Sequence, residues 1–276
     1  MMSVWRRLNH IFVYSFLCLV ALLQLSPLLA TLFNSFRSTK DITKFPIGLP
    51  TQYNLENYIE AWKVGEYTRA FANSIIVSSV STISVVLMAI IAGFFLARSN
   101  FKIKDYIITY FGVALSIPVF AFLVPVYFSF SELGLVDHLI GLVLLFIAIN
   151  MPFNILLSRT YILGIPRELD ESATMDGCSV YQIIWNIIFP ISKPIITTIA
   201  LIVFVTTWNE FTVANTFLQS PELKTASTKY VLFVGERGSD LSLVYTAGIV
   251  TMLPIVAVFI ALQNYFIEGM TTGSIK

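Results

Sequence analysis

The sequence predicts an all-α, polytopic membrane protein with six transmembrane helices, and three observations support this fold class. Hydrophobic residues make up 57% of the 276 residues and charged residues only 12%, against roughly 25% charged in soluble domains. Six apolar segments reach the length of about 20 residues that a helix needs to cross a bilayer. Nearly all charged residues lie between these segments, so lipid is expected to be the main solvent of the chain.

The first apolar segment runs from Ile11 to Phe33. Arg6 and Arg7 before it, and the small residue Ala30 near its end, would also suit a secretory signal peptide. The segment is longer than the usual signal core and matches the width of a bilayer, so we interpret it as the first membrane helix. The six spans are expected at residues about 10–33, 71–97, 106–130, 138–159, 191–217 and 242–267, within one transmembrane domain of residues 1–276.

Two features mark the interiors of these spans. In the second span Ala89, Gly93 and Ala97 repeat every four residues, which predicts a flat stripe for close helix packing. Prolines also interrupt the spans, and each removes a backbone donor and bends its helix. Such breaks suit a transporter whose loosened backbone lines a cavity, and they equally suit ordinary kinks. The prolines are Pro27, Pro118, Pro125, Pro152 and Pro254.

The orientation follows from the lysine and arginine residues near the ends of the spans. An even number of spans places both chain ends on one side, and an excess of basic residues in short loops marks the cytoplasmic side. The opposite loops also carry basic residues, but they are longer and contain compensating acids. We therefore expect both termini in the cytoplasm. The basic residues on that side are Arg6, Arg7, Arg98, Lys102, Lys104, Arg159, Arg167 and Lys193.

The loop at about 164–190, between the fourth and fifth spans, has the pattern of two short helices joined by a sharp turn. Pro166 suits a first helical turn, and Glu168, Asp170 and Glu171 place acids near the positive end of the helix dipole. Gly177 can adopt the left-handed conformation that ends a helix. The sequence therefore predicts a first short helix that stops at this glycine.

A second helix is expected directly after this turn. Ser179 and Gln182 have the spacing of a capping box, in which each side chain bonds the other residue's backbone N–H. The helix can then continue toward Pro190. A rigid pair of helices outside the membrane is a shape suited to docking on a partner.

The same loop resembles the EAA loop of ABC importer permeases, in which Glu-Ala-Ala is followed by a glycine and then by Ile-x-Leu-Pro. Glu171-Ser172-Ala173, Gly177 and the run from Ile187 to Pro190 stand at the same separations here. Ser172 replaces an alanine and Phe189 a leucine. Neither change removes the acid, the glycine or the proline.

Other segments are similar to carbohydrate permeases of the maltose-transporter type, especially the shorter subunit of the permease pair. They are Asn73-Ser74, Ala97-Arg98, Trp208-Asn209-Glu210-Phe211 and the terminal run from Gly269 to Lys276. The resemblance implies a type I ABC importer permease fold in a prokaryotic plasma membrane. It also implies a heterodimer with a homologous permease, two ATPase subunits that bind the ATP and magnesium, and an extracellular solute-binding protein. The cargo would be a carbohydrate, with an oligosaccharide as the first choice.

By this resemblance, residues 168–182 form a coupling helix that sits in a groove of the ATPase. The acids would meet polar or basic groups there, and the small residues would allow close approach. The alternative is a solvated loop whose acids only favour the start of a helix. The residues expected to couple to the ATPase are Glu168, Glu171, Ser172, Ala173, Asp176, Gly177 and Pro190.

Glu210 is the one acid within an expected span, where ionisable groups are costly and often functional. Together with Trp208 and Asn209 it could line the pathway of a sugar. The alternative is a polar clamp between helices near the outer boundary of the membrane.

Other classes of function lack their residues. The chain has only two histidines, His10 and His138, and contains no metalloprotease or serine-hydrolase motif and no phosphate-binding loop, so no catalytic set and no bound cofactor are expected. Cys18 and Cys178 are too far apart in sequence to suggest a metal site, and the net charge of +1 gives no reason to expect nucleic acid. A secondary carrier or channel, which would show inverted repeats, and a permease for a non-sugar solute are the remaining alternatives.

Overall fold

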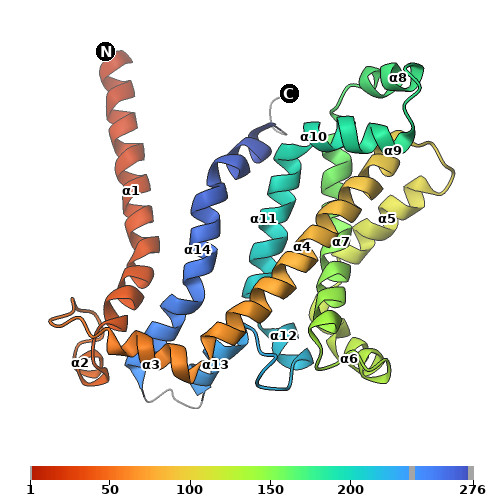
Figure 1. Cartoon of the computed structure of the whole chain (residues 1–276). Coiled ribbons are helices and arrows are strands. Elements are labelled where there is room, and N and C mark those ends of the chain that lie inside the picture. The colour runs from red at the N-terminus through yellow and green to blue at the C-terminus, as the bar shows by residue number, and fades with distance from the viewer. Residues whose placement is uncertain (1, 236–239, 273–276) are drawn as a thin grey trace. The chain divides into compact units, whose positions relative to one another are not determined.

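The computed structural model describes residues 2–235 and 240–272, and the described part is helical throughout its regular elements (Figure 1). Four helices are long and apolar enough to cross a membrane, namely His10–Ser35, Tyr67–Arg98, Leu139–Leu163 and Leu241–Ala261. Two bent helix pairs raise this number to six if each pair is one span. The chain divides into two compact units, made of residues 1–67 with 229–253 and of residues 68–228 with 254–276.

The first unit contains α1 (Met2–Ser35), α2 (Thr39–Lys44), α3 (Glu56–Val64), most of α13 (Ala226–Gly235) and the first part of α14 (Leu241–Thr272). Polar groups fasten its segments. Thr246 of α14 donates to the carbonyl of Ser35 at 3.0 Å, and Thr39 donates to Asp240 at 2.6 Å. The end of α1 is thereby fixed to the beginning of α14.

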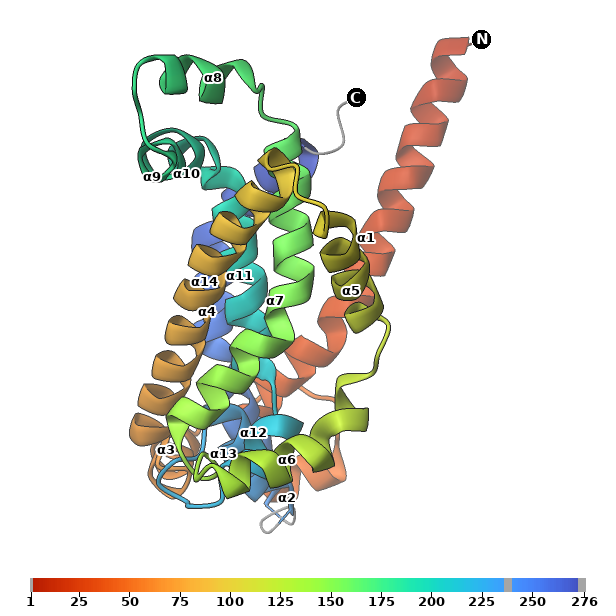
Figure 2. The same cartoon turned by 90° about the vertical axis from the view of Figure 1, so that its right-hand side faces the viewer.

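The second unit contains α4 (Tyr67–Arg98) from Thr68 onward and the helices around it. These are α5 (Lys104–Leu115), the 3₁₀ turn η1 (Val119–Phe122), α6 (Leu123–Glu132), α7 (Leu139–Leu163), α8 (Glu168–Met175), α9 (Val180–Ile183), the π-helical turn η2 (Ile184–Ile188), α10 (Phe189–Ile191), α11 (Lys193–Asn209) and α12 (Thr212–Phe217). Figures 1 and 2 show α8, α9 and α10 at one end of α4 and α7, and α6 and α12 at the other.

Close packing of α4 against α7 and α11 forms the centre of this unit. Val85, Ala89 and Ile90 of α4 meet Ile155 of α7 and Ile199 of α11 in one buried cluster. The small-residue stripe expected on α4 is confirmed, because Ala89 and Ala97 are both fully buried. A Cβ atom added at Gly93 would lie 2.5 Å from Ser158 Oγ of α7, so only glycine allows this approach.

The third expected span, 106–130, is not one straight helix. Lys104–Leu115 and Val119–Glu132 meet at an angle of 91°. The break falls at Pro118, which has no N–H to donate and disfavours helical geometry at Ile117 before it. A cavity of about 320 Å³ lies in this bend, with an apolar lining that includes Phe122, Leu145 and Pro152.

The fifth expected span, 191–217, is also interrupted. α11 ends at Asn209, Glu210 is extended with φ −68° and ψ 121°, and α12 begins at Thr212. At its other end α11 meets the segment Val180–Ile191 at an angle of 78°. The sixth span is α14, which continues through Pro254 as one helix. The terminal residues 273–276 of the run noted above lie outside the described residues.

Candidate coupling surface and pathway residues

The loop between α7 and α11 forms the two-helix elbow that the sequence predicts. We use the name elbow for residues 168–191, which contain α8, α9, η2 and α10. α8 ends in a left-handed turn at Gly177, whose φ is +85°. The N–H of Cys178 donates to the carbonyl of Ala173 at 2.9 Å, and that of Gly177 to Thr174 at 3.0 Å. These two bonds form the Schellman motif that satisfies the last carbonyls of a helix.

The second arm of the elbow begins with the expected capping box. The N–H of Ser179 donates to Gln182 Oε1 at 2.7 Å, and the N–H of Gln182 donates to Ser179 Oγ at 3.4 Å. From there α9, η2 and α10 carry the helix to Ile191. The sequence therefore encodes both the turn and the direction in which the chain leaves it.

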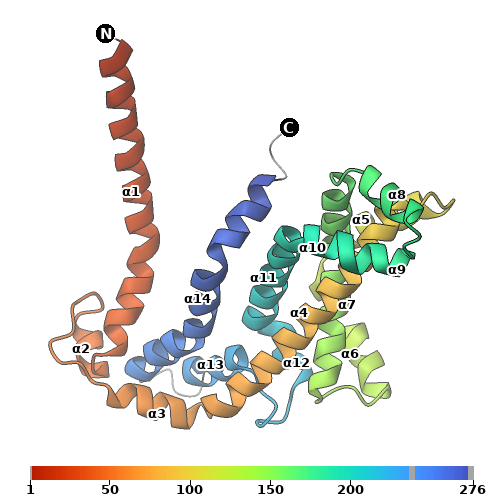
Figure 3. The same cartoon turned by 45° about the horizontal axis from the view of Figure 1, so that its top comes forward.

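Apolar side chains of the elbow pack on the ends of α4 and α7. Ala173 of α8 and Ile184 and Ile188 of η2 share a buried cluster with Phe94 of α4 and Ile162 of α7. Burial of these side chains fixes the elbow to the membrane helices by the hydrophobic effect. Figure 3 shows α9 and α10 beside the ends of α4 and α7.

A buried ion pair also ties the elbow to α4. Arg98, the last residue of α4, meets Asp170 of α8 with 2.5 Å between Nε and Oδ2, and the two side chains are only 9% and 15% exposed. Arg98 Nη2 donates to the carbonyl of Ile165 at 2.9 Å, and Arg167 Nη2 to that of Ala97 at 3.4 Å. Sequence reasoning treated Asp170 only as an acid at the start of a helix. Its pairing with a residue 72 positions earlier has no local sequence signal.

The outer surface of the elbow carries most of the residues expected to couple to a partner. Glu168, Glu171, Ser172, Asp176 and Gly177 are all exposed, and so is Pro190 at the far end. Exposed apolar side chains lie among them, with Met175 88% and Tyr181 71% exposed. Ala173 differs from the expectation. It is 6% exposed and faces the chain's own core, so its small size serves packing on α4 and α7.

The residues expected to line a pathway take three different positions. Trp208 is 1% exposed and packs between Phe71 of α4 and Phe204 of α11, with ring centroids 5.9 and 5.8 Å away. Asn209 is exposed at the end of α11. The structure thus does not bring these two side chains to one surface.

Glu210 lies after the end of α11 and not inside a helix as the sequence suggested. Its carboxylate accepts from the N–H groups of Val213 and Ala214, both at 3.0 Å, at the start of α12. Its carbonyl accepts from the hydroxyl of Ser227 at 3.0 Å. The first N–H groups of a helix lack internal partners and favour a negative charge, so Glu210 acts here as the cap of α12.

A polar contact inside the spans was missed by sequence reasoning. Thr206 of α11 donates to Asn150 Oδ1 of α7 at 3.4 Å, and Asn150 also donates to the carbonyl of Phe146 at 2.8 Å. Both residues are at least partly accessible. Polar groups within membrane helices usually face a bundle interior or a cavity, which makes this pair a candidate for the pathway.

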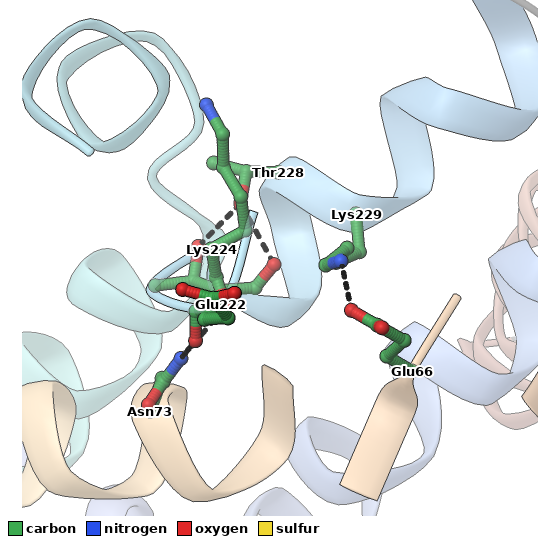
Figure 4. A network of polar contacts seen from close by, with 7 residues as sticks. Glu66, Asn73, Glu222, Lys224, Thr228 and Lys229 are labelled. Carbon is green, nitrogen blue, oxygen red and sulfur yellow. Dashed lines mark hydrogen bonds and ion pairs between the residues drawn. The ribbon is translucent and has the colours of Figure 1, made fainter. Parts of the chain in front are cut away.

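Asn73 and Ser74 at the start of α4 hold the loop before α13 (Figure 4). The amide of Asn73 donates to the carbonyls of Glu222 and Lys224 at 2.8 and 3.1 Å. Ser74 Oγ accepts from the N–H of Ala226 at 2.9 Å. Asn73 and Ser74 therefore position the backbone of the loop before α13.

Figure 4 also shows an ion pair in the first unit, between Lys229 and Glu66 at 2.8 Å. Glu66 has a positive φ of 48° and lies directly before α4. Among the residues that the structure describes, no group of three or more His, Cys, Asp or Glu could hold a metal ion.

A set of apolar helices of spanning length, with an elbow packed on the ends of two of them, defines this chain as a multi-pass membrane protein. It belongs to the family described as "Binding-protein-dependent transport system inner membrane component", whose model matches residues 86–272. It is therefore a multi-pass permease component of a binding-protein-dependent importer.

Three relatives illustrate the similarity. The probable ABC transporter permease protein YurM of Bacillus subtilis is 31% identical over 97% of this chain and 88% of its own length. The melibiose/raffinose/stachyose import permease MelC of Bacillus subtilis is 32% identical over 82% of this chain and 83% of its own. The arabinooligosaccharides transport system permease AraQ of Halalkalibacterium halodurans is 29% identical over 93% of both chains.

The fold is also similar to a solved structure. A chain of a bacterial ABC transporter involved in the import of the acidic polysaccharide alginate superposes with a TM-score of 0.80. The match covers 94% of this chain and 97% of the other, at 22% sequence identity. The likeness establishes the type I importer permease fold for this chain.

Proposed function

We propose that this chain is one of two homologous permease subunits of an ATP-driven importer and forms half of the translocation pathway for an oligosaccharide. The observation that carries the proposal is the elbow, which is anchored on one side to α4 and α7 and exposes acids and apolar side chains on the other. A chain without a phosphate-binding loop must take its energy from a partner, and a rigid knob is suited to receive it.

In this proposal two ATPase subunits bind ATP and magnesium, and one of them receives the elbow in a groove. Glu168, Glu171 and Asp176 meet polar or basic groups of the ATPase, while Met175 and Tyr181 supply apolar contact area. Closure of the ATPase pair moves the elbow. Because the elbow is fixed to α4 and α7, its displacement shifts these helices between two arrangements.

The oligosaccharide follows from what the relatives are named for. MelC is named for melibiose, raffinose and stachyose, and AraQ is named for arabinooligosaccharides. The permease NgcG of Streptomyces coelicolor is named for diacetylchitobiose and is 28% identical over 95% of this chain. Short chains of sugar units are common to all three names. An extracellular solute-binding protein would deliver such a molecule to the permease pair.

Within this subunit, Asn209 is the member of the predicted pathway set that is free to meet a sugar, because it is exposed at the end of α11. Asn150 and Thr206 extend the polar surface along α7 and α11. Trp208 supports this surface from behind, and the carboxylate of Glu210 is engaged by α12. The spans lie in a prokaryotic plasma membrane with both termini in the cytoplasm. The basic residues in the short loops on the side of the elbow favour this orientation.

The test uses the assembled transporter in proteoliposomes with its binding protein, and compares ATP hydrolysis with uptake of labelled raffinose or arabinotriose. Glu171→Lys should reduce both sugar uptake and sugar-stimulated ATP hydrolysis, because a positive charge on the elbow would oppose docking. Lys44→Glu, an exposed charge reversal in α2, is the matched control and should change neither rate. Unchanged uptake and hydrolysis in Glu171→Lys would contradict the coupling role.

A further inference from the structure

A second pocket lies in the first unit, beyond the end of α1. It has a volume of about 500 Å³, within the range of small-molecule sites. Figure 3 shows α2 and the loop before α3, which supply its walls. The lining residues are Phe36, Ser38, Asp41, Gln52, Tyr53, Asn54, Leu55 and Glu56.

One wall of this pocket is aromatic. Phe36 packs edge-on against Tyr53, with ring centroids 5.5 Å apart, and against Tyr58 at 5.3 Å. Tyr53 nevertheless remains 71% exposed, so most of its ring is available to a ligand. An aromatic ring that presents an apolar face and a hydroxyl suits a molecule with both C–H surfaces and hydroxyl groups.

The remaining walls carry planar amide and carboxylate groups. Asp41, Gln52, Asn54 and Glu56 all line the pocket, and the side chains of Gln52 and Glu56 make no hydrogen bond or ion pair within the described part of the chain. Such groups can accept from and donate to adjacent hydroxyls. Among the described residues no lysine or arginine lines the pocket, and its two acids oppose the entry of an anion.

The pocket is built on a rigid base. The guanidinium of Arg37, 6% exposed, donates to Asn34 Oδ1 and the carbonyl of Phe45, both at 2.8 Å, and to the carbonyl of Asp41 at 3.0 Å. The amide of Asn57 donates to the carbonyls of Ser35 and Arg37 at 2.9 and 3.2 Å. These bonds fix the pocket walls before any ligand arrives, which lowers the entropy cost of binding.

We propose that this pocket is a binding site for a neutral carbohydrate on the side of the membrane opposite the elbow. The side follows from the six spans expected from the sequence, because one expected span precedes the pocket and four precede the elbow. The proposal rests on the proposed function for the direction of transport and for the class of cargo. It adds a site outside the spans that holds a sugar unit between Tyr53 and the polar side chains around it.

The experiment places a cysteine in the pocket and asks whether sugar shields it. Gln52→Cys is made in a background with Cys18→Ser and Cys178→Ser, and the assembled transporter in nanodiscs is labelled with a polar maleimide, without the binding protein. Raffinose or arabinotriose should slow labelling about threefold at a concentration near twice its Kd, since occupied sites are protected. Glu60→Cys, exposed on α3 outside the pocket, is the control and should label at an unchanged rate.

Tyr53→Ala should abolish the protection of Gln52→Cys by sugar, and Tyr53→Phe should keep it, because the ring and not the hydroxyl forms the wall. A trimer of galacturonate should protect less than the neutral sugars. If neither neutral sugar slows labelling while ATP-driven sugar uptake persists, the pocket proposal is refuted and the transport function stands. Protection by the sugar-free binding protein alone would also refute it, since the surface would then be a protein docking site.

Discussion

Arg98 and Asp170 form a largely buried ion pair between α4 and the elbow. Their side chains are 9% and 15% exposed, so neither charge can regain full hydration if its partner is lost. Breaking a buried pair by removing one partner costs roughly 3–5 kcal/mol, whereas the net gain of the intact pair is much smaller. Loss of one partner is therefore expected to displace or destabilise the elbow, although the intact pair adds little net stability.

Asp170→Ala should uncouple ATP hydrolysis from uptake, and Arg98→Ala should do the same, because each leaves the other charge buried and unpaired. The double variant Arg98→Asp with Asp170→Arg should recover at least part of the coupling. The ratio of sugar transported to ATP hydrolysed in proteoliposomes measures this. A loss in the double variant equal to the sum of the two single losses would mean that the charges act independently.

Gly177 holds the turn of the elbow in a left-handed conformation, at φ +85°, and a Cβ atom there would meet nothing within 4 Å. Gly177→Ala should therefore cost only the conformational term, about 1–2 kcal/mol. Gly177→Asn should cost less, because asparagine enters this conformation more readily. Thermal unfolding of the purified transporter checks the order glycine, asparagine, alanine, and an alanine variant as stable as the parent would contradict it.

Asp137 connects the loop before α7 to the loop after α12. It accepts from the hydroxyl and N–H of Ser220 and from the N–H of Gln219, and these hydrogen bonds hold its pKa below the usual range. The carboxylate therefore stabilises the folded loop at any pH above the ordinary value for aspartate, near 3.9, and this contribution is lost as pH falls through the lowered pKa. The contact of Asp137 with Gln219 and Ser220 should therefore weaken only at acidic pH.

Hydrogen exchange of the Gln219 and Ser220 amides should become faster below about pH 4, beyond the intrinsic pH dependence of exchange. Asp137→Asn should show the faster exchange already at neutral pH, since its neutral amide is a weaker acceptor. Asp105→Asn, an exposed acid in the first turn of α5, is the matched control and should leave these two amides unchanged. No acceleration in Asp137→Asn would contradict the assignment.

At the scale of the element, α4 shows how a single small residue sets a helix distance. A Cβ atom at Gly93 would lie 2.5 Å from Ser158 Oγ and 2.9 Å from the backbone nitrogen of Arg159. Backbone cannot move away as a side chain can, so the two helices would have to separate along their contact. The buried cluster of Val85, Ile90 and Ile155 lies in that same contact.

Gly93→Ala should destabilise the purified protein by an amount typical of overpacking, about 1–3 kcal/mol, and should therefore lower the temperature at which it aggregates. Gly112→Ala in α5 is the control, because a Cβ atom there would meet nothing within 4 Å and alanine favours helix. Size-exclusion chromatography after heating compares the two variants. Equal stability of both would show that the helices adjust without loss.

The sequence located the bent spans but predicted each of them as one continuous helix. Length and hydropathy indicated the third span from 106 to 130, and Pro118 was noted within it. A proline in a membrane helix can produce a mild kink or a full turn, depending on the neighbours that accept the freed backbone groups. Here the neighbours allow a turn of 91°, and an apolar cavity of about 320 Å³ lies in the bend.

At the scale of the whole molecule, the chain has the properties of a part and not of a complete transporter. The most apolar part of α1 has no buried residue within its own chain, so lipid or another subunit must cover it. The described elbow likewise presents its acids and Met175 outward. Both features agree with a permease subunit that assembles with other chains.

If the importer is driven by ATP, sugar uptake by the assembled transporter should continue when sodium and proton gradients are collapsed by ionophores. Omission of ATP should abolish it, because the energy enters through the partner ATPase. Uptake of labelled raffinose or arabinotriose into proteoliposomes measures both conditions. Gradient-driven uptake by this chain alone would instead identify a secondary carrier.

The sequence by itself determined the membrane class, the approximate positions of the apolar segments and the local geometry of the elbow, namely the helix stop at Gly177 and the capping box of Ser179 and Gln182. These features depend on composition and on residues within about four positions of each other, which are visible in a linear chain.

Only the tertiary structure decided that Ala173 faces inward, that Asp170 pairs with Arg98, and that Glu210 caps α12 outside a span. Each depends on a backbone break or a partner brought near by packing. The Asp170 ion pair and the burial of Ala173 are long-range contacts selected by the free energy of the folded whole, so no local pattern in the sequence records them. The contact of Glu210 is local, but it exists only because the helix breaks after Asn209, and the continuous apolar pattern of the expected span did not indicate that break.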